Sequence, residues 1–160
     1  MRFCTRPASL RALALLLFLA ACATPTTLET VDSGLSGRIT DQVRISDHPH
    51  YVLMGHVLIA ARGDEITRAL VIQQRRDGVH SLRIRQAWQD GRRLPYRSLN
   101  RRLGCIRGQC RDNAVGFISF SAAMLERAAQ DGFSATLIGP EGAIEITVPP
   151  RIFAEALAPP

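Results

Sequence analysis

The spacing of hydrophobic and polar positions predicts a series of short strands along most of the chain. Runs rich in β-branched and aromatic residues, bounded by turn-forming residues, predict strands at 36–45, 66–74, 79–88 and 114–120. In 79–88 the pattern alternates, so that Leu82, Ile84 and Trp88 fall on one face and Arg83 and Arg85 on the other. This alternation predicts a sheet with one face in the core and two arginines side by side on its outer face.

The segment 51–61 differs from these strands because it is apolar at both odd and even positions. As a strand it would be buried on both faces, and a short helix is the alternative. Asp77-Gly78 predicts a type I′ hairpin turn, and Asp90-Gly91 predicts a second turn. Pro140-Glu141-Gly142 predicts a hairpin between the strands on either side of it.

Two helices are predicted towards the C-terminal end. Ser121 is a favourable N-cap for a helix over 121–131, and Gly132 stands at its C′ position. Pro150 suits the first turn of a closing helix, where its missing N–H costs nothing. The predicted fold class is therefore α+β and β-rich, an antiparallel sheet or small sandwich of about seven strands with two short C-terminal helices.

The first residues have the pattern of a secretory signal. Arg2, Arg6 and Arg11 precede an apolar run that begins at Ala12, and no acidic residue occurs before Glu29. The run is shorter than the roughly 20 residues that a membrane-spanning helix needs. The predicted organisation is a signal peptide at 1–21, a flexible tether at 22–34 and a single β-rich globular domain at 35–158.

The end of that run, Leu19-Ala20-Ala21-Cys22, resembles a bacterial lipobox. The resemblance implies cleavage before Cys22, a thioether-linked diacylglyceryl group on its sulfur and an acylated amino terminus. Ala23 follows the cysteine where an aspartate would favour the inner membrane, so the resemblance implies an outer-membrane lipoprotein that faces the periplasm. The alternative is an ordinary secretory signal with a cysteine beside its cleavage site.

Charge is unevenly distributed along the chain. All 20 basic residues are arginines, and removing 1–21 lowers the formal net charge from +6 to +3. The segment 75–111 holds most of the remaining arginines and only two acids, Asp77 and Asp90. Arg83, Arg85, Arg92 and Arg93 are the candidate ligand-binding residues, since converging guanidinium groups bind phosphate or carboxylate in a bidentate manner. A solvated surface is the alternative, and an exported protein does not meet nucleic acid.

The four cysteines have three different predicted roles. Cys4 lies in the signal, and Cys22 is the lipid carrier. Cys105 and Cys110, with Gly108 between them, predict a disulfide that staples a turn in an oxidising compartment, worth about 2 kcal/mol. Paired spacing for zinc is absent, and a redox dithiol more often shows Cys-x-x-Cys at the start of a helix.

The C-terminal half carries a second resemblance. The order of Cys105 and Cys110, a strand, the helix at 121–131, a hairpin and the closing PPRIFAEAL helix resembles the end of the invasion-associated locus B family of exported bacterial proteins. The phrases CIRGQC, LERAAQDGFSATLIG and VPPRIFAEAL also resemble small uncharacterised proteobacterial lipoproteins. Neither resemblance implies a catalytic residue.

Three histidines, His48, His50 and His56, are candidate metal ligands close to Asp47. The alternative is a polar turn before a buried strand, with His56 in the core. A Gly-x-Ser-x-Gly nucleophile elbow and a lysine-bearing phosphate loop are both missing.

The sequence thus predicts a lipid-anchored envelope protein that acts as a non-enzymatic structural or interaction module, without a cofactor beyond the lipid on Cys22. Its expected partners are the membrane, through the anchor, and an envelope protein or anionic envelope component. The alternative is a periplasmic protein that binds a metal through His48, His50 and His56 or an anionic ligand through the arginines of 75–111.

Overall fold

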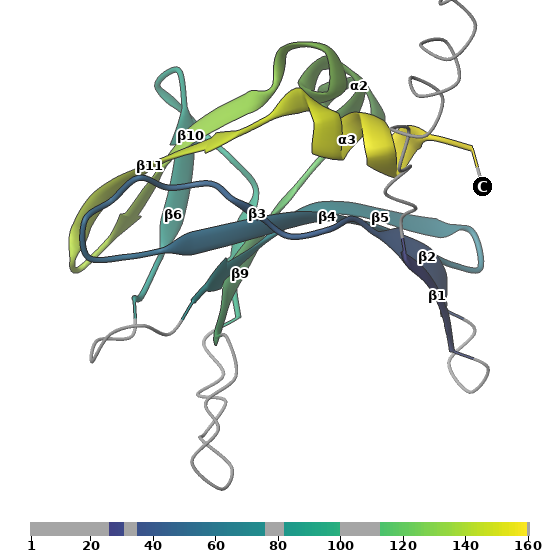
Figure 1. Ribbon diagram of the computed structural model, residues 1–160, viewed down its shortest axis with the longest axis horizontal. Helices are drawn as coiled ribbons and strands as arrows, with labels where there is room; N and C mark the ends of the chain where they lie inside the picture. The colour runs from purple at the N-terminus through teal and green to yellow at the C-terminus, as the bar shows by residue number, and fades with distance from the viewer. Residues whose placement is uncertain (1–25, 31–34, 76–81, 100–112, 160) are drawn as a thin grey trace, which may run out of the picture.

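The computed structural model describes residues 26–30, 35–75, 82–99 and 113–159 (Figure 1). These residues form two antiparallel sheets and two helices. The larger sheet has the strand order β1-β2-β4-β5-β9-β8, with β3 also paired to β4, and the smaller has the order β11-β10-β6-β7. The β-rich α+β class with two short C-terminal helices is confirmed.

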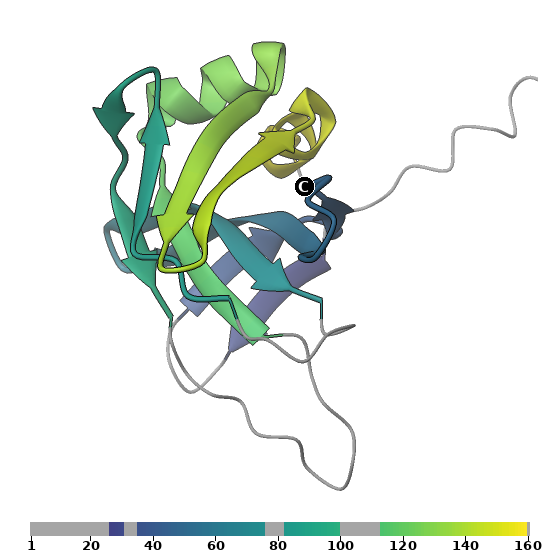
Figure 2. The same cartoon turned by 90° about the vertical axis from the view of Figure 1, so that its left-hand side faces the viewer.

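The strands of the larger sheet are β1 (Thr26–Thr30), β2 (Leu35–Ile39), β3 (Val43–Arg44), β4 (Leu53–Arg62), β5 (Glu65–Gln74), β8 (Tyr96–Ser98) and β9 (Asn113–Ser119). The smaller sheet contains β6 (Gln86–Gln89), β7 (Arg92–Arg93), β10 (Phe133–Gly139) and β11 (Gly142–Val148). Its strands run steeply across those of the larger sheet (Figure 2).

The long hairpin of β4 and β5 forms the centre of the larger sheet. Leu53 and Val57 of β4 face the core and are fully buried, whereas His56 and Ala60 on the other face are also buried. The predicted strand with two buried faces is confirmed, since buried residues occur at both odd and even positions of β4.

The two helices, α2 (Ala122–Asp131) and α3 (Pro150–Leu157), pack against each other, and α3 lies over β4 (Figure 1). Both have the predicted ends. The Ser121 hydroxyl oxygen accepts the Met124 N–H at 3.2 Å, Gly132 has a φ of 79°, and Pro150 occupies the first turn of α3. None of the helices in the described part of the chain is both long and apolar enough to cross a membrane.

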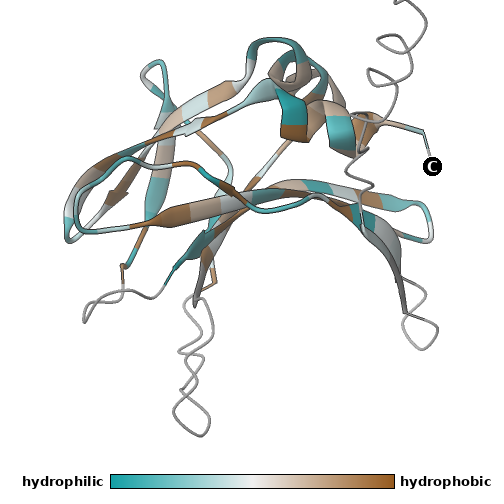
Figure 3. Ribbon diagram, viewed as in Figure 1, coloured by the Kyte–Doolittle hydropathy of each residue, from teal (hydrophilic) through white to brown (hydrophobic). Residues whose placement is uncertain are grey.

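The hydrophobic core lies between the two sheets and beneath the helices. Phe120, Phe133 and Phe153 meet in its middle, with ring centroids 5.0 to 6.4 Å apart. Polar and apolar residues alternate along strands of both sheets (Figure 3), which places Ala135 and Leu137 of β10 inside and leaves Ser134 exposed. Local periodicity therefore decides which face of each strand meets the core.

One predicted face is wrong. Leu82 and Ile84 are buried as expected, but Ala87 takes the next inward position and Trp88 lies half-exposed on the outer face. Strand β6 begins only at Gln86, so the chain changes parity between Ile84 and Ala87. The indole Nε1–H then finds a partner outside the core, the Gln86 Oε1 at 2.9 Å, which satisfies a donor that burial would leave costly.

Two further elements differ from the expected boundaries. The range 36–45 contains two strands, β2 and β3, because the pairing with β4 shifts by one residue between Ile39 and Val43. Strand β1 lies inside the range 22–34 expected to be a flexible tether, since its backbone pairs with β2 over five positions. The predicted turn at Asp77-Gly78 lies outside the described residues.

Candidate functional site

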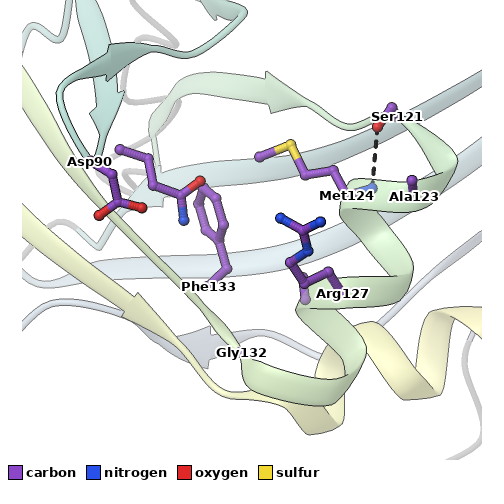
Figure 4. Close-up of a pocket in the computed structure, with 9 residues that line it drawn as sticks. Asp90, Ser121, Ala123, Met124, Arg127, Gly132 and Phe133 are labelled. Atoms are coloured by element: carbon purple, nitrogen blue, oxygen red, sulfur yellow. Dashed lines mark hydrogen bonds between the residues drawn. The ribbon is translucent and has the colours of Figure 1, made fainter.

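A cleft of about 340 Å³ lies between the first turns of α2 and the β6–β7 turn (Figure 4). Met124 and Ala128 of α2 and Phe133 of β10 supply its apolar surface, and Arg127 and Asp90 supply charge. Figure 4 shows Arg127 and Met124 extending from α2 towards Phe133, with Asp90 on the far side.

Local sequence places each wall of this cleft. The predicted turn at Asp90-Gly91 is present as a two-residue hairpin turn between β6 and β7, with positive φ values of 48° and 74°, and Asp90 lines the cleft beside α2. Met124 and Arg127 are three positions apart, which puts them on neighbouring parts of one helix face.

The two charged groups of the cleft are free to meet a ligand. Both Asp90 and Arg127 are exposed, and neither forms an ion pair or a side-chain hydrogen bond within the described residues. The Ser121 hydroxyl is engaged as the N-cap of α2. The arrangement can hold an apolar group of a ligand between a cation and a carboxylate. Arg127 and Asp90 are not arranged as a nucleophile and its general base.

A shallower cleft of about 270 Å³ adjoins the first on the outer face of the smaller sheet and shares Gln89 and Asp90 with it. Cross-strand pairing places one residue from each strand in a row, in the order Arg93, Trp88, Thr136 and Glu145. Side chains directly opposite each other in an antiparallel sheet lie on the same face. Sequence reasoning missed this row because it assigned Trp88 to the core.

The four candidate arginines, Arg83, Arg85, Arg92 and Arg93, are all exposed. Arg83 and Arg85 lie beside the β10–β11 hairpin, where the Arg85 N–H donates to the Ile138 carbonyl at 2.9 Å. Arg92 and Arg93 form β7 at the edge of the smaller sheet. The structure therefore divides the four into two pairs at opposite ends of β6 and gathers no more than one of them into any described cleft.

The three candidate histidines do not form one group. His48 and His50 lie in the segment before β4 with their rings 5.8 Å apart, and His48 also stacks near Tyr51 at 5.0 Å. His56 is buried within β4, and its burial lowers the pKa of its imidazole. Across the described ranges, no three His, Cys, Asp or Glu side chains form a group that could hold a metal ion.

Cys22, Cys105 and Cys110 lie outside the described residues, so the lipidation and the disulfide stay predictions. Sequence reasoning also did not single out Arg127 or Asp90 as site residues. The Asp90-Gly91 pair and the helical spacing of Met124 and Arg127 were visible in the sequence, but their approach across the cleft depends on how the smaller sheet packs against α2.

The described residues form a β-rich α+β domain of two antiparallel sheets with open, shallow clefts. The chain matches no family model, no curated protein and no solved structure. The two family resemblances drawn from the sequence therefore stay predictions.

Proposed function

We propose that this chain is a lipid-anchored envelope protein of the outer membrane, facing the periplasm, which acts as a non-enzymatic interaction module. The observation that carries the proposal is the lipobox-like Leu19-Ala20-Ala21-Cys22 directly after a positively charged, apolar signal. Each buried methylene of an acyl chain contributes about 0.8 kcal/mol, so several chains on Cys22 would make the anchor effectively permanent.

The described domain supports an interaction role. Its two adjoining clefts present unpaired charge beside apolar surface, with Arg127 and Asp90 on opposite walls and Met124 and Phe133 between them. Such a surface suits an apolar side chain of an envelope partner that is flanked by polar or charged groups. The proposed role is to hold that partner close to the membrane.

The anchor is tested by expressing the full chain in a bacterium with an outer membrane and supplying a clickable fatty acid. The wild type and the Cys4→Ser variant should incorporate label and fractionate with the outer membrane, because Cys4 lies in the removed signal. The Cys22→Ser variant should incorporate none. Intact-mass measurement should show a chain that begins at Cys22 with added acyl mass. An unmodified mature terminus in the wild type would refute the proposal.

A second candidate function, binding of an anionic envelope component, is favoured by one observation. Arg83, Arg85, Arg92 and Arg93 are all exposed, and within the described ranges none of them forms an ion pair. Purified protein should bind lipopolysaccharide in a salt-sensitive manner, and replacing all four by glutamine should weaken that binding. Binding that the fourfold variant retains would exclude these arginines as the binding surface.

A further inference from the structure

A third surface lies on the inner face of the larger sheet, beyond the end of α3. Cross-strand pairing sets Thr27, Arg38, Ile59 and Arg68 in one row across β1, β2, β4 and β5. A second row, one step closer to the tip of the β4–β5 hairpin, contains Ser36, Ala61 and Ile66. With Ala156 and Leu157 of α3 these rows line a groove of about 480 Å³, which we call the β1–α3 groove.

The β1–α3 groove collects exposed apolar side chains. Three large hydrophobic residues of the described chain are exposed: Ile66 by 49 %, Leu157 by 43 % and Ile138 by 38 %. Two of them, Ile66 and Leu157, line this groove, and Ile138 lies on the other sheet. Scattered apolar residues need no explanation, whereas two that line one groove with polar residues around them are consistent with an interaction surface.

The charges of the groove have one sign. Arg38 and Arg68 line it, and its described lining includes no acidic residue. The Arg38 guanidinium also donates to the Ala158 carbonyl, which ties β2 to the end of α3. Arg68 makes no side-chain hydrogen bond or ion pair within the described ranges, so its guanidinium is available to an anion.

The position of the groove relative to Cys22 suggests its occupant. Thr27 lies on its rim, and the described chain begins at Thr26, four positions after Cys22. Four residues of extended chain span at most about 14 Å. A lipid on Cys22 would therefore keep this groove within reach of the phospholipid headgroups.

We propose that the β1–α3 groove is the membrane-facing surface of the protein and that it binds anionic phospholipid headgroups of the anchoring bilayer. Arg68 and Arg38 contact the phosphates, and Ile66 and Leu157 enter the interfacial region, as amphipathic surfaces do. The inference rests on the proposed lipid anchor and adds an orientation to it. The Arg127–Asp90 cleft and the outer face of the smaller sheet then remain accessible to partners.

The orientation is tested with the full lipoprotein, purified from membranes and reconstituted into vesicles that contain brominated phosphatidylglycerol or brominated phosphatidylcholine. A Trp88→Phe background removes the only tryptophan. Single tryptophans are then introduced as Ile66→Trp, Leu157→Trp and, as the matched exposed control, Ile138→Trp. Circular dichroism checks that each variant keeps the fold.

Bromine should quench the tryptophans at positions 66 and 157 at least twofold more strongly than the one at position 138. Quenching should be stronger in phosphatidylglycerol than in phosphatidylcholine. Adding Arg68→Gln should reduce the difference between the two lipids, whereas Arg44→Gln, at an exposed position of β3 that does not line the groove, should not. Equal quenching at 66 and 138 would overturn the inference, as would strong quenching of native Trp88 in the otherwise unchanged protein.

The same preparation separates failure of the inference from failure of the anchor. Intact-mass measurement reports whether Cys22 carries lipid. A lipidated protein with no preference for quenching at position 66 refutes only the orientation. An unmodified protein that does not associate with vesicles refutes both the anchor and the orientation that rests on it.

Discussion

The aromatic cluster beneath the helices provides the sharpest test of the fold. Phe153 of α3 is fully buried, and its ring centroid lies 5.6 Å from that of Phe120 and 6.4 Å from that of Phe133. Replacing a buried phenylalanine by alanine costs about 3–5 kcal/mol, since the transfer free energy is lost and a cavity remains. Alanine is also the better helix former, so Phe153→Ala cannot act by weakening α3 itself.

The measurements are urea unfolding and thermal unfolding of residues 23–160, both followed by circular dichroism. For a domain of this size a loss of about 3–5 kcal/mol lowers the melting temperature by roughly 6–20 °C. Leu157→Ala in the same helix is the matched control, because Leu157 is 43 % exposed and its truncation should cost less than about 1 kcal/mol. If Phe153→Ala destabilises no more than Leu157→Ala, the docking of α3 on the phenylalanine cluster is incorrect.

Three further outcomes are expected. Because burial lowers the pKa of His56, the folded state binds fewer protons there than the unfolded state. The stability that neutral His56 contributes is therefore fully present above the unfolded pKa near 6.5 and is lost as the pH falls through the folded pKa. The unfolding free energy falls by at most about 1.4 kcal/mol per pH unit in that range. In urea unfolding, His56→Leu should make the unfolding free energy less dependent on pH, and an unchanged dependence would show that His56 does not cause it. Gly116→Ala should destabilise by about 1–3 kcal/mol, since a Cβ there would lie 2.2 Å from the hydroxyl oxygen of Tyr96; a variant as stable as the wild type in thermal unfolding would contradict the close approach of β8 to β9. Cys105 and Cys110 should resist alkylation until a reductant is added, and mass spectrometry that finds both alkylated without reduction would exclude the disulfide.

Local patterns were sufficient for the elements whose ends are set by neighbouring residues. The Ser121 cap, Gly132 and Pro150 act within one turn of the chain, so α2 and α3 were predicted with nearly their observed bounds. The doubly apolar run at 51–61 favoured a strand buried on both faces, with a short helix as the alternative, and the structure has the strand β4 there.

The register of β6 was not predictable in this way. A change of parity between Ile84 and Ala87 moves Trp88 from the expected core face to the outer face, and it depends on how β6 pairs with β10. Strand β1 was missed for a similar reason, because its short polar sequence becomes a strand through pairing with β2.

The clefts are the features that local sequence patterns predict least. Asp90 and Arg127 are far apart in the sequence, and they face each other only because the smaller sheet packs against α2. The β1–α3 groove likewise combines β1, β2, β4, β5 and the end of α3. The sequence by itself determined most of the secondary structure and the helix ends, because these follow from short-range periodicity and caps. The clefts and the groove arise from long-range pairing and packing, because their walls come from segments that lie far apart in the chain.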